Sequence, residues 1–216
     1  MSLDGNPVTL ALFLGAMSLI PLMFITTTAF LKIAMVLMIV RNALGVQQVP
    51  PSMAVYSIAL AATFFVMAPV FSEIQNSVKG TESGALNEDQ IVETIDRIKT
   101  PLMGFMASNV DTQISERLKS TAREMWPARM SQSMTNESFF ILLPSFVISE
   151  LQAGFKIGFL IYIPFVVIDL IVSNILLALG MQMVAPITVT VPIKILLFVL
   201  VDGWAKLLES LIYTYL

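Results

Sequence analysis

Five ionisable side chains lie within or beside long apolar stretches of this chain, and they are the residues whose chemistry most needs an explanation. An ion buried alone in apolar surroundings is too costly for a fold, so such groups pair, face water or become neutral. A spacing of four residues places the last two on one helix face, and the third precedes the fourth by about two turns. The set fits either a proton or ion path, or structural ion pairs between helices or subunits. The five are Lys32, Asp169, Lys194, Asp202 and Lys206.

Catalytic chemistry has few candidates in this sequence. Asp169 and Asp202 raise the possibility of an intramembrane aspartyl protease, in which two carboxylates share one proton, but neither has a tyrosine or glycine in front of it. Histidine and cysteine are both absent, which excludes histidine bases, thiolate nucleophiles, disulfides and metal sites built from these residues. A Ser–Lys pair stays open, although no spacing singles one out. We therefore expect no enzyme activity, no cofactor and no metal.

The composition is that of a membrane protein. Of the 216 residues, 56% are hydrophobic and 12% are charged, against about 25% charged in soluble domains. The net charge of −3 supplies no basic excess for a nucleic-acid backbone, so nucleic acid is not an expected partner. The charges are concentrated in the middle third of the chain. The sequence therefore predicts apolar residues 1–71, a polar insert over 72–137 and apolar residues 138–216.

Apolar runs predict the membrane segments. Residues 8–40 are too long for one span and are expected to break or kink at Pro21. Residues 54–71 and 157–179 fit one span each. The last run, 187–216, carries four charges and is a poor membrane helix. Four spans can be counted, of which two cannot face lipid on all sides.

Helical spacing continues into the polar insert. Ile91, Ile95, Ile98 and Leu102 follow one another at intervals of four, three and four residues, which places them on one helix face. The insert is therefore predicted to be a small helical unit.

One pair of methionines stands outside the helices. Met181 and Met183 follow Gly180, which favours a helix end, and precede Pro186, so they are predicted in a turn at the tip of a helical hairpin. Residues 188–192 alternate β-branched residues before a proline and are predicted to be extended. Flexible thioethers in a loop could close around a narrow opening, whereas most methionines only fill gaps in packing.

Several long motifs resemble the FliP/SctR family of type III secretion export apparatus proteins, in its injectisome branch. The longest is Pro-Ser-Phe-Val-Ile-Ser-Glu-Leu-Gln-Ala-Gly-Phe-Lys-Ile-Gly-Phe. The motifs cover about two thirds of the chain and leave out the insert. They occupy residues 144–159, 164–170, 179–181, 40–50, 192–194 and 202–204.

The resemblance implies an all-α membrane protein whose kinked helical hairpins pack into a helical, cone-like oligomer with an axial pore. It implies about five copies in the bacterial inner membrane, partly raised towards the periplasm, with SctS and SctT and also SctU and SctV. Inner-rod or needle proteins, secreted substrates and membrane lipid are further implied partners. The family places the insert in the periplasm, although seven of the twelve basic residues lie there, a count that favours the cytoplasm.

The resemblance also assigns site residues. It places the pore gate at Met181 and Met183, with Gln182 at a position where close relatives can carry a third methionine. Glu150 and Lys156, on either side of Gly154, are expected to join subunits. Independently of the resemblance, Lys32 and Asp169 are a candidate ion pair between helices, because each is a lone charge in an apolar run. The competing function is a small ion-coupled transporter that uses Asp169 and Asp202 as proton carriers.

Overall fold

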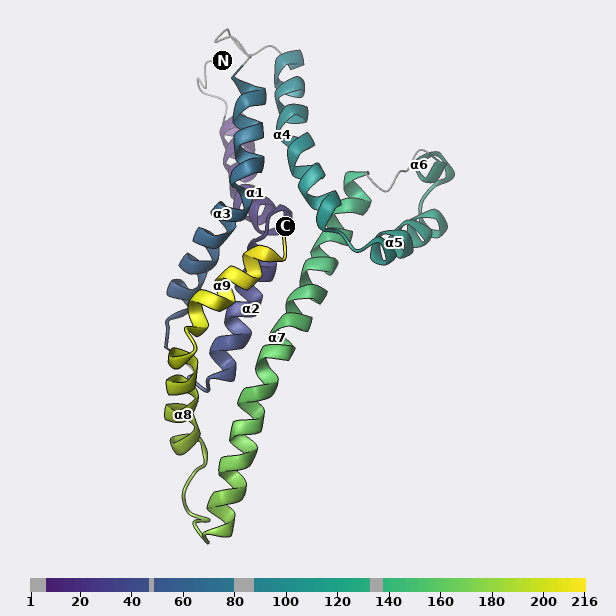
Figure 1. Ribbon diagram of the computed structural model, residues 1–216. Helices are drawn as coiled ribbons and strands as arrows, with labels where there is room; N and C mark the ends of the chain where they lie inside the picture. The colour runs from purple at the N-terminus through teal and green to yellow at the C-terminus, as the bar shows by residue number, and fades with distance from the viewer. Residues whose placement is uncertain (1–6, 47–48, 80–87, 133–137) are drawn as a thin grey trace. The chain divides into compact units, whose positions relative to one another are not determined.

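The computed structural model describes residues 7–46, 49–79, 88–132 and 138–216. Within these residues all regular secondary structure is helical (Figure 1), which confirms the predicted all-α fold. The helices are α1 (Pro7–Thr27), α2 (Phe30–Ala43), α3 (Ser52–Val78), α4 (Glu88–Asn109), α5 (Thr112–Met125), α6 (Ala128–Gln132), α7 (Phe139–Ala178), α8 (Ile187–Leu200) and α9 (Gly203–Tyr213).

Two of the described helices, α3 and α7, are long and apolar enough to cross a membrane, and the number rises to four if the broken pairs α1–α2 and α8–α9 each count as one span. This agrees with a membrane protein. Helix α7 has 40 residues and is therefore about 60 Å long. A hydrocarbon core is about 30 Å thick and helix tilts reach about 40°, so part of α7 must lie outside that core.

The first apolar run breaks at a different residue from the one predicted. Pro21 lies inside α1, and the helix ends six residues later at Thr27, before Thr28 and Ala29. The Thr28 hydroxyl donates to the Phe24 carbonyl oxygen at 2.7 Å and accepts from the Phe30 backbone N–H at 3.4 Å. This side chain therefore satisfies backbone groups at the break, as threonine does where helices end and begin.

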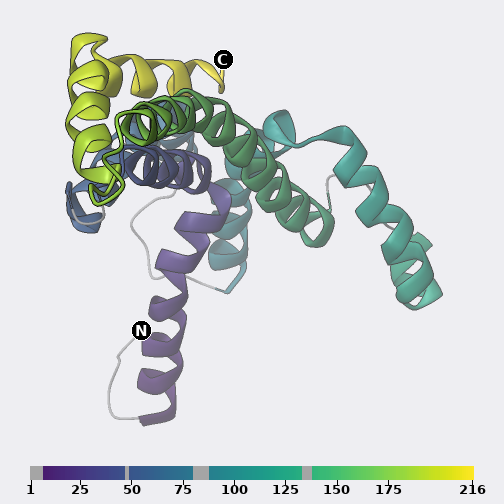
Figure 2. The same ribbon diagram turned by 90° about the horizontal axis from the view of Figure 1, so that it is seen from below.

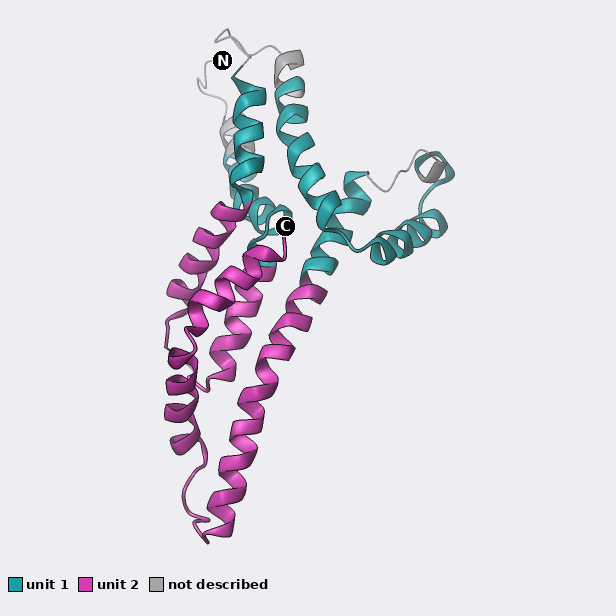
Figure 3. Cartoon of the chain, in the orientation of Figure 1, with its two compact units in different colours: residues 1–31, 67–150 teal, residues 32–66, 151–216 magenta. Residues whose placement is uncertain are grey.

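The chain folds into two compact units (Figure 3), each built from two separate stretches of sequence. Unit 1 contains Met1–Leu31 and Met67–Glu150, and unit 2 contains Lys32–Val66 and Leu151–Leu216. The division by charge into residues 1–71, 72–137 and 138–216 stays a prediction.

Unit 1 has a small core of Met106, Leu142 and Phe146, with Phe105 edge-on to Phe146 at 5.9 Å between ring centroids. Ile91 lies outside the side chains that the structure describes. Ile95, Ile98 and Leu102 line one apolar groove, as their spacing predicts.

A polar junction fixes the start of α5 in unit 1. Asp111 caps the helix, because its carboxylate accepts from the backbone N–H groups of Gln113 and Ile114. The backbone N–H of Asp111 in turn donates to the Ser149 hydroxyl of α7 at 2.9 Å. The beginning of α5 is therefore held against α7.

In unit 2, α2 packs along α7 at two glycines (Figures 1 and 2). Gly154 and Gly158 are one turn apart. A Cβ at Gly158 would lie 2.5 Å from Ile39 Cδ1 and 3.2 Å from Ile39 Cβ, and a Cβ at Gly154 would meet the end of the Met35 side chain. The close approach of the two helices therefore depends on the missing side chains.

Replacing Gly158 by alanine tests this close approach. Gly158→Ala should lower the free energy of unfolding by about 1–3 kcal/mol, because Ile39 branches at Cβ and cannot move away cheaply. The measurement is unfolding of the purified protein by SDS in mixed micelles. Gly104→Ala is the matched control, since a Cβ there meets nothing within 4 Å, and it should stabilise the helix by about 0.5–1 kcal/mol. A similar gain for Gly158→Ala would contradict this packing.

Candidate functional site

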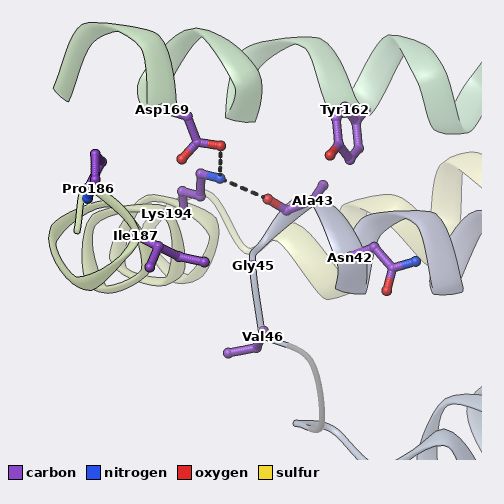
Figure 4. Close-up of a pocket in the computed structure, with 9 residues that line it drawn as sticks. All are labelled: Asn42, Ala43, Gly45, Val46, Tyr162, Asp169, Pro186, Ile187 and Lys194. Atoms are coloured by element: carbon purple, nitrogen blue, oxygen red, sulfur yellow. Dashed lines mark hydrogen bonds and ion pairs between the residues drawn. The ribbon is translucent and has the colours of Figure 1, made fainter. Parts of the chain in front are cut away.

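Lys194 joins three helices of unit 2 (Figure 4). It belongs to a buried stripe on α8 together with Thr190 and Phe198, at intervals of four residues, so its side chain points into the unit. Its Nζ donates to Asp169 Oδ2 of α7 at 2.5 Å and to the carbonyl oxygen of Ala43, the last residue of α2, at 3.1 Å.

The bond to Ala43 has a clear electrostatic reason. The last four carbonyl groups of a helix have no partner within it, and together they attract a cation. Lys194 supplies that cation at the end of α2. Gly45 then turns the chain away with φ of +77°, and a Cβ there would lie 2.9 Å from the Val191 side chain of α8. Glycine is required here both for the backbone conformation and for the space.

We call Lys194, together with Asp169 and the Ala43 carbonyl, the lysine clamp. The lysine clamp borders a pocket of about 530 Å³ in unit 2. Lys194 is deeply buried, with 4% of its side chain exposed, whereas 44% of the Asp169 side chain is exposed. The ammonium is therefore shielded from solvent, whereas solvent reaches the carboxylate. The lining residues are Asn42, Ala43, Gly45, Val46, Tyr162, Asp169, Pro186, Ile187 and Lys194.

The expected pair of Lys32 with Asp169 is wrong. Asp169 pairs with Lys194, and Lys32 Nζ instead lies 3.5 Å from the centre of the Tyr215 ring. An aromatic face attracts an ammonium group, most strongly where water is excluded, and Lys32 is buried. Nothing in the sequence pattern singled out Tyr215 for this contact.

The prediction that Lys194, Asp202 and Lys206 lie on one helix face is also wrong, because they do not belong to one helix. Asp202 lies in the turn between α8 and α9, with φ of +55°, and the two helices meet at a bend of 62°. Asp202 is exposed, and it forms no ion pair with Lys206 in the described part of the chain. Gly203 permits the bend, because a Cβ there would meet the Phe198 ring.

Glu150 and Lys156 lie in different surroundings. Glu150 is almost fully buried, whereas Lys156 is exposed on α7. Their role in joining subunits stays a prediction.

The tip of the α7–α8 hairpin is a turn of defined geometry. The backbone N–H of Met181 donates to the Leu176 carbonyl, and that of Gly180, with φ of +72°, donates to the Leu177 carbonyl. This pair of bonds is the Schellman motif, which ends helices at glycine. The predicted turn is therefore confirmed. Beyond it Met181, Gln182 and Met183 are exposed, Met183 completely.

The return from the tip differs from the prediction of an extended segment over residues 188–192. Helix α8 begins at Ile187, directly after Pro186, and continues through Pro192. The β-branched residues favour a strand only weakly. Burial of Thr190, Lys194 and Phe198 on one helix face outweighs that preference.

Comparison with known proteins identifies the family. The sequence model of the FliP family matches residues 13–211. The chain belongs to the FliP family. The resemblance seen in the motifs is thereby confirmed, and the chain is a membrane component of the type III secretion apparatus of the SctR type.

Relatives match this FliP-family chain over nearly its whole length. The harpin secretion protein HrcR of Erwinia amylovora is 56% identical over 98% of this chain and 97% of its own. The Yop proteins translocation protein R of Yersinia pestis is 41% identical over 97% of each chain. The virulence protein YscR of Salmonella typhimurium is 36% identical over the full length of both.

The lysine clamp is tested by removing one or both charges. Asp169→Ala should lower the free energy of unfolding by about 3 kcal/mol, because it leaves a buried ammonium unpaired. The double variant Asp169→Leu/Lys194→Met should recover most of this loss, since it removes both charges together. SDS unfolding of each variant measures the coupling. Losses that simply add in the double variant would show that the two residues act independently.

Proposed function

We propose that this chain is a non-enzymatic, pore-forming subunit of the type III secretion export gate, which conducts unfolded proteins across the bacterial inner membrane. About five copies surround the axis, each presenting its α7–α8 tip to the pore, together with SctS, SctT, SctU and SctV. The polar residues between α3 and α7 face the periplasm, towards which the assembly is partly raised. Inner-rod or needle proteins and secreted substrates pass through the opening.

The exposed methionines of the tip carry this proposal. Met181 and Met183 project from a turn whose backbone is fixed by two hydrogen bonds. A fixed backbone with unbranched, flexible side chains suits a seal. At rest the side chains would fill the opening, and they would move aside to fit different extended chains. Gln182 adds a polar group between the two apolar ones.

Exposed apolar surface supports an assembly around this chain. Phe155, Phe159 and Leu160 of α7 are each more than half exposed, as is Leu200 of α8. Exposed apolar side chains of this size, where they gather into a patch, mark contact with other proteins or with lipid. Sister copies and the partner subunits would cover it in the export gate.

The alternative is a small ion-coupled transporter in which Asp169 and Asp202 carry protons. Asp169 forms an ion pair with the buried Lys194 ammonium, which fits a structural ion pair between helices better than a proton carrier. Native mass spectrometry of the co-expressed subunits separates the two functions, because a gate subunit co-purifies as a large hetero-oligomer and a transporter as a monomer or dimer.

Replacing the tip methionines tests the seal. Met181→Ala/Met183→Ala should raise the ion conductance of the closed export complex in planar bilayers several-fold, because the smaller side chains leave the axis open. Assembly should be unchanged, since both side chains project away from the hairpin.

Met53→Ala is the control, because Met53 is also highly exposed but lies at the start of α3. It should leave the conductance of the closed complex unchanged. Conductance of the double variant equal to that of the unmodified complex would contradict the proposed seal.

A further inference from the structure

Arg41 is a buried cation without a counter-ion. It lies in the last turn of α2 and is 8% exposed. Between Lys32 and Glu73 it is the only charged residue of the sequence, and it forms no ion pair among the residues that the structure describes. The carbonyl end of α2 attracts this cation but supplies no full negative charge. A buried charge of this kind is costly unless a partner is provided.

The guanidinium of Arg41 uses only one of its three nitrogens. Nη1 donates to Ser52 Oγ at 2.9 Å and to the Pro50 carbonyl oxygen at 3.5 Å. Nε is buried and has no hydrogen-bond partner, and within the described part of the chain both hydrogen bonds of the side chain leave from Nη1. Nε and Nη2 form the edge of a guanidinium that can bind an anion with two parallel hydrogen bonds. This edge is unused.

The first turn of α3 places further donors beside the guanidinium, as the bond from Arg41 to Ser52 shows. Helix α3 has 27 residues, begins at Ser52 and has no acidic side chain in its first turn. The N–H groups of Ala54 and Val55 donate to the Pro51 carbonyl oxygen, which leaves the two preceding N–H groups, those of Ser52 and Met53, available. A helix N-terminus with free N–H groups attracts anions such as phosphate.

Apolar side chains flank these donors. Val49 is 66% exposed, Met53 80% and Tyr56 43%. Both helices that meet here belong to candidate membrane segments, since α3 is long and apolar enough to cross a bilayer and α2 is part of a bent pair that qualifies as one span. The ends of such segments lie at the level of the lipid headgroups, where tyrosine is common.

We propose that Arg41 and the first turn of α3 bind the phosphate group of an anionic phospholipid. Arg41 supplies the charge and its two-donor edge, the N–H groups of Ser52 and Met53 supply further donors, and the acyl chains lie against the exposed apolar side chains. Because Nε is covered in the free chain, binding includes a small shift of the Arg41 side chain. The position of the site, at the ends of two apolar helices, favours a lipid over the acidic side chain of a partner protein.

Native mass spectrometry of the full-length protein, purified in detergent, tests this site. The protein is mixed with phosphatidylglycerol or with diacylglycerol, which carries the same acyl chains and no phosphate. The unmodified protein should retain one phosphatidylglycerol several-fold more strongly than diacylglycerol. Equal retention of the two lipids by the unmodified protein would overturn the proposal, whatever the variants do.

Arg41→Lys tests the role of the guanidinium edge. It should remove most of the preference for phosphatidylglycerol, because lysine keeps the charge but cannot form two parallel hydrogen bonds, and circular dichroism should show unchanged helix content. Lys206→Gln is the matched control, since Lys206 is an exposed cation on α9 of the same unit, and it should keep the preference. An equal loss in both variants would overturn the site, because it would show attraction to cations in general.

Two further probes distinguish the source of the anion. Inorganic phosphate should displace phosphatidylglycerol only at far higher concentration than the lipid, because it has no acyl chains to contact the apolar side chains. If it binds as tightly as the lipid, and does so only with Arg41 in place, the site takes free phosphate and the lipid is wrong. A tetraglutamate peptide should not displace the lipid. Displacement by this peptide would assign the edge to the carboxylate of a partner protein and overturn the proposal.

Discussion

One buried ammonium group sets the arrangement of unit 2. Lys194 satisfies the carbonyl end of α2 and the carboxylate of Asp169 on α7 at the same time, so three helices meet at a single atom. Burying such a charge is unfavourable unless both partners are in place. This contact couples the positions of α2, α7 and α8 within the unit. If one of these helices shifted, the Lys194 ammonium would lose a hydrogen-bond partner.

The neighbouring glycines follow from that coupling. With α2 and α7 joined at Lys194, the helices continue side by side, and Gly154 and Gly158 allow them to approach where Met35 and Ile39 fill the space. Gly45 lets the chain leave α2 across α8. The α7–α8 hairpin then extends beyond the clamp and ends in the hydrogen-bonded turn that carries Met181 and Met183. A clamped base and a capped tip give flexible side chains a fixed point of attachment.

The features that could be predicted are those that depend on a few neighbouring residues in the sequence. Gly180 and Pro186 mark the tip because each favours one backbone conformation, and the all-helical fold follows from apolar runs and spacing. The partner of Asp169 could not be predicted. In the sequence, Lys32 and Lys194 each stand as a single charge in an apolar run, and only tertiary packing distinguishes them. Two predictions from local preference were wrong. Residues 188–192 are helical, because one face of α8 is buried. The first apolar run breaks at Thr28 and not at Pro21.

In the proposed export gate, the α7–α8 tips of several copies meet around one axis. The chain contains no cysteine, so Met183→Cys introduces a single thiol at the most exposed point of the tip. In export complexes purified with the partner subunits, mild oxidation should convert this variant into covalent dimers, as neighbouring tips come within disulfide reach. A thiol that reacts freely with maleimide but leaves only monomers after oxidation would mean that the tips do not line a common pore.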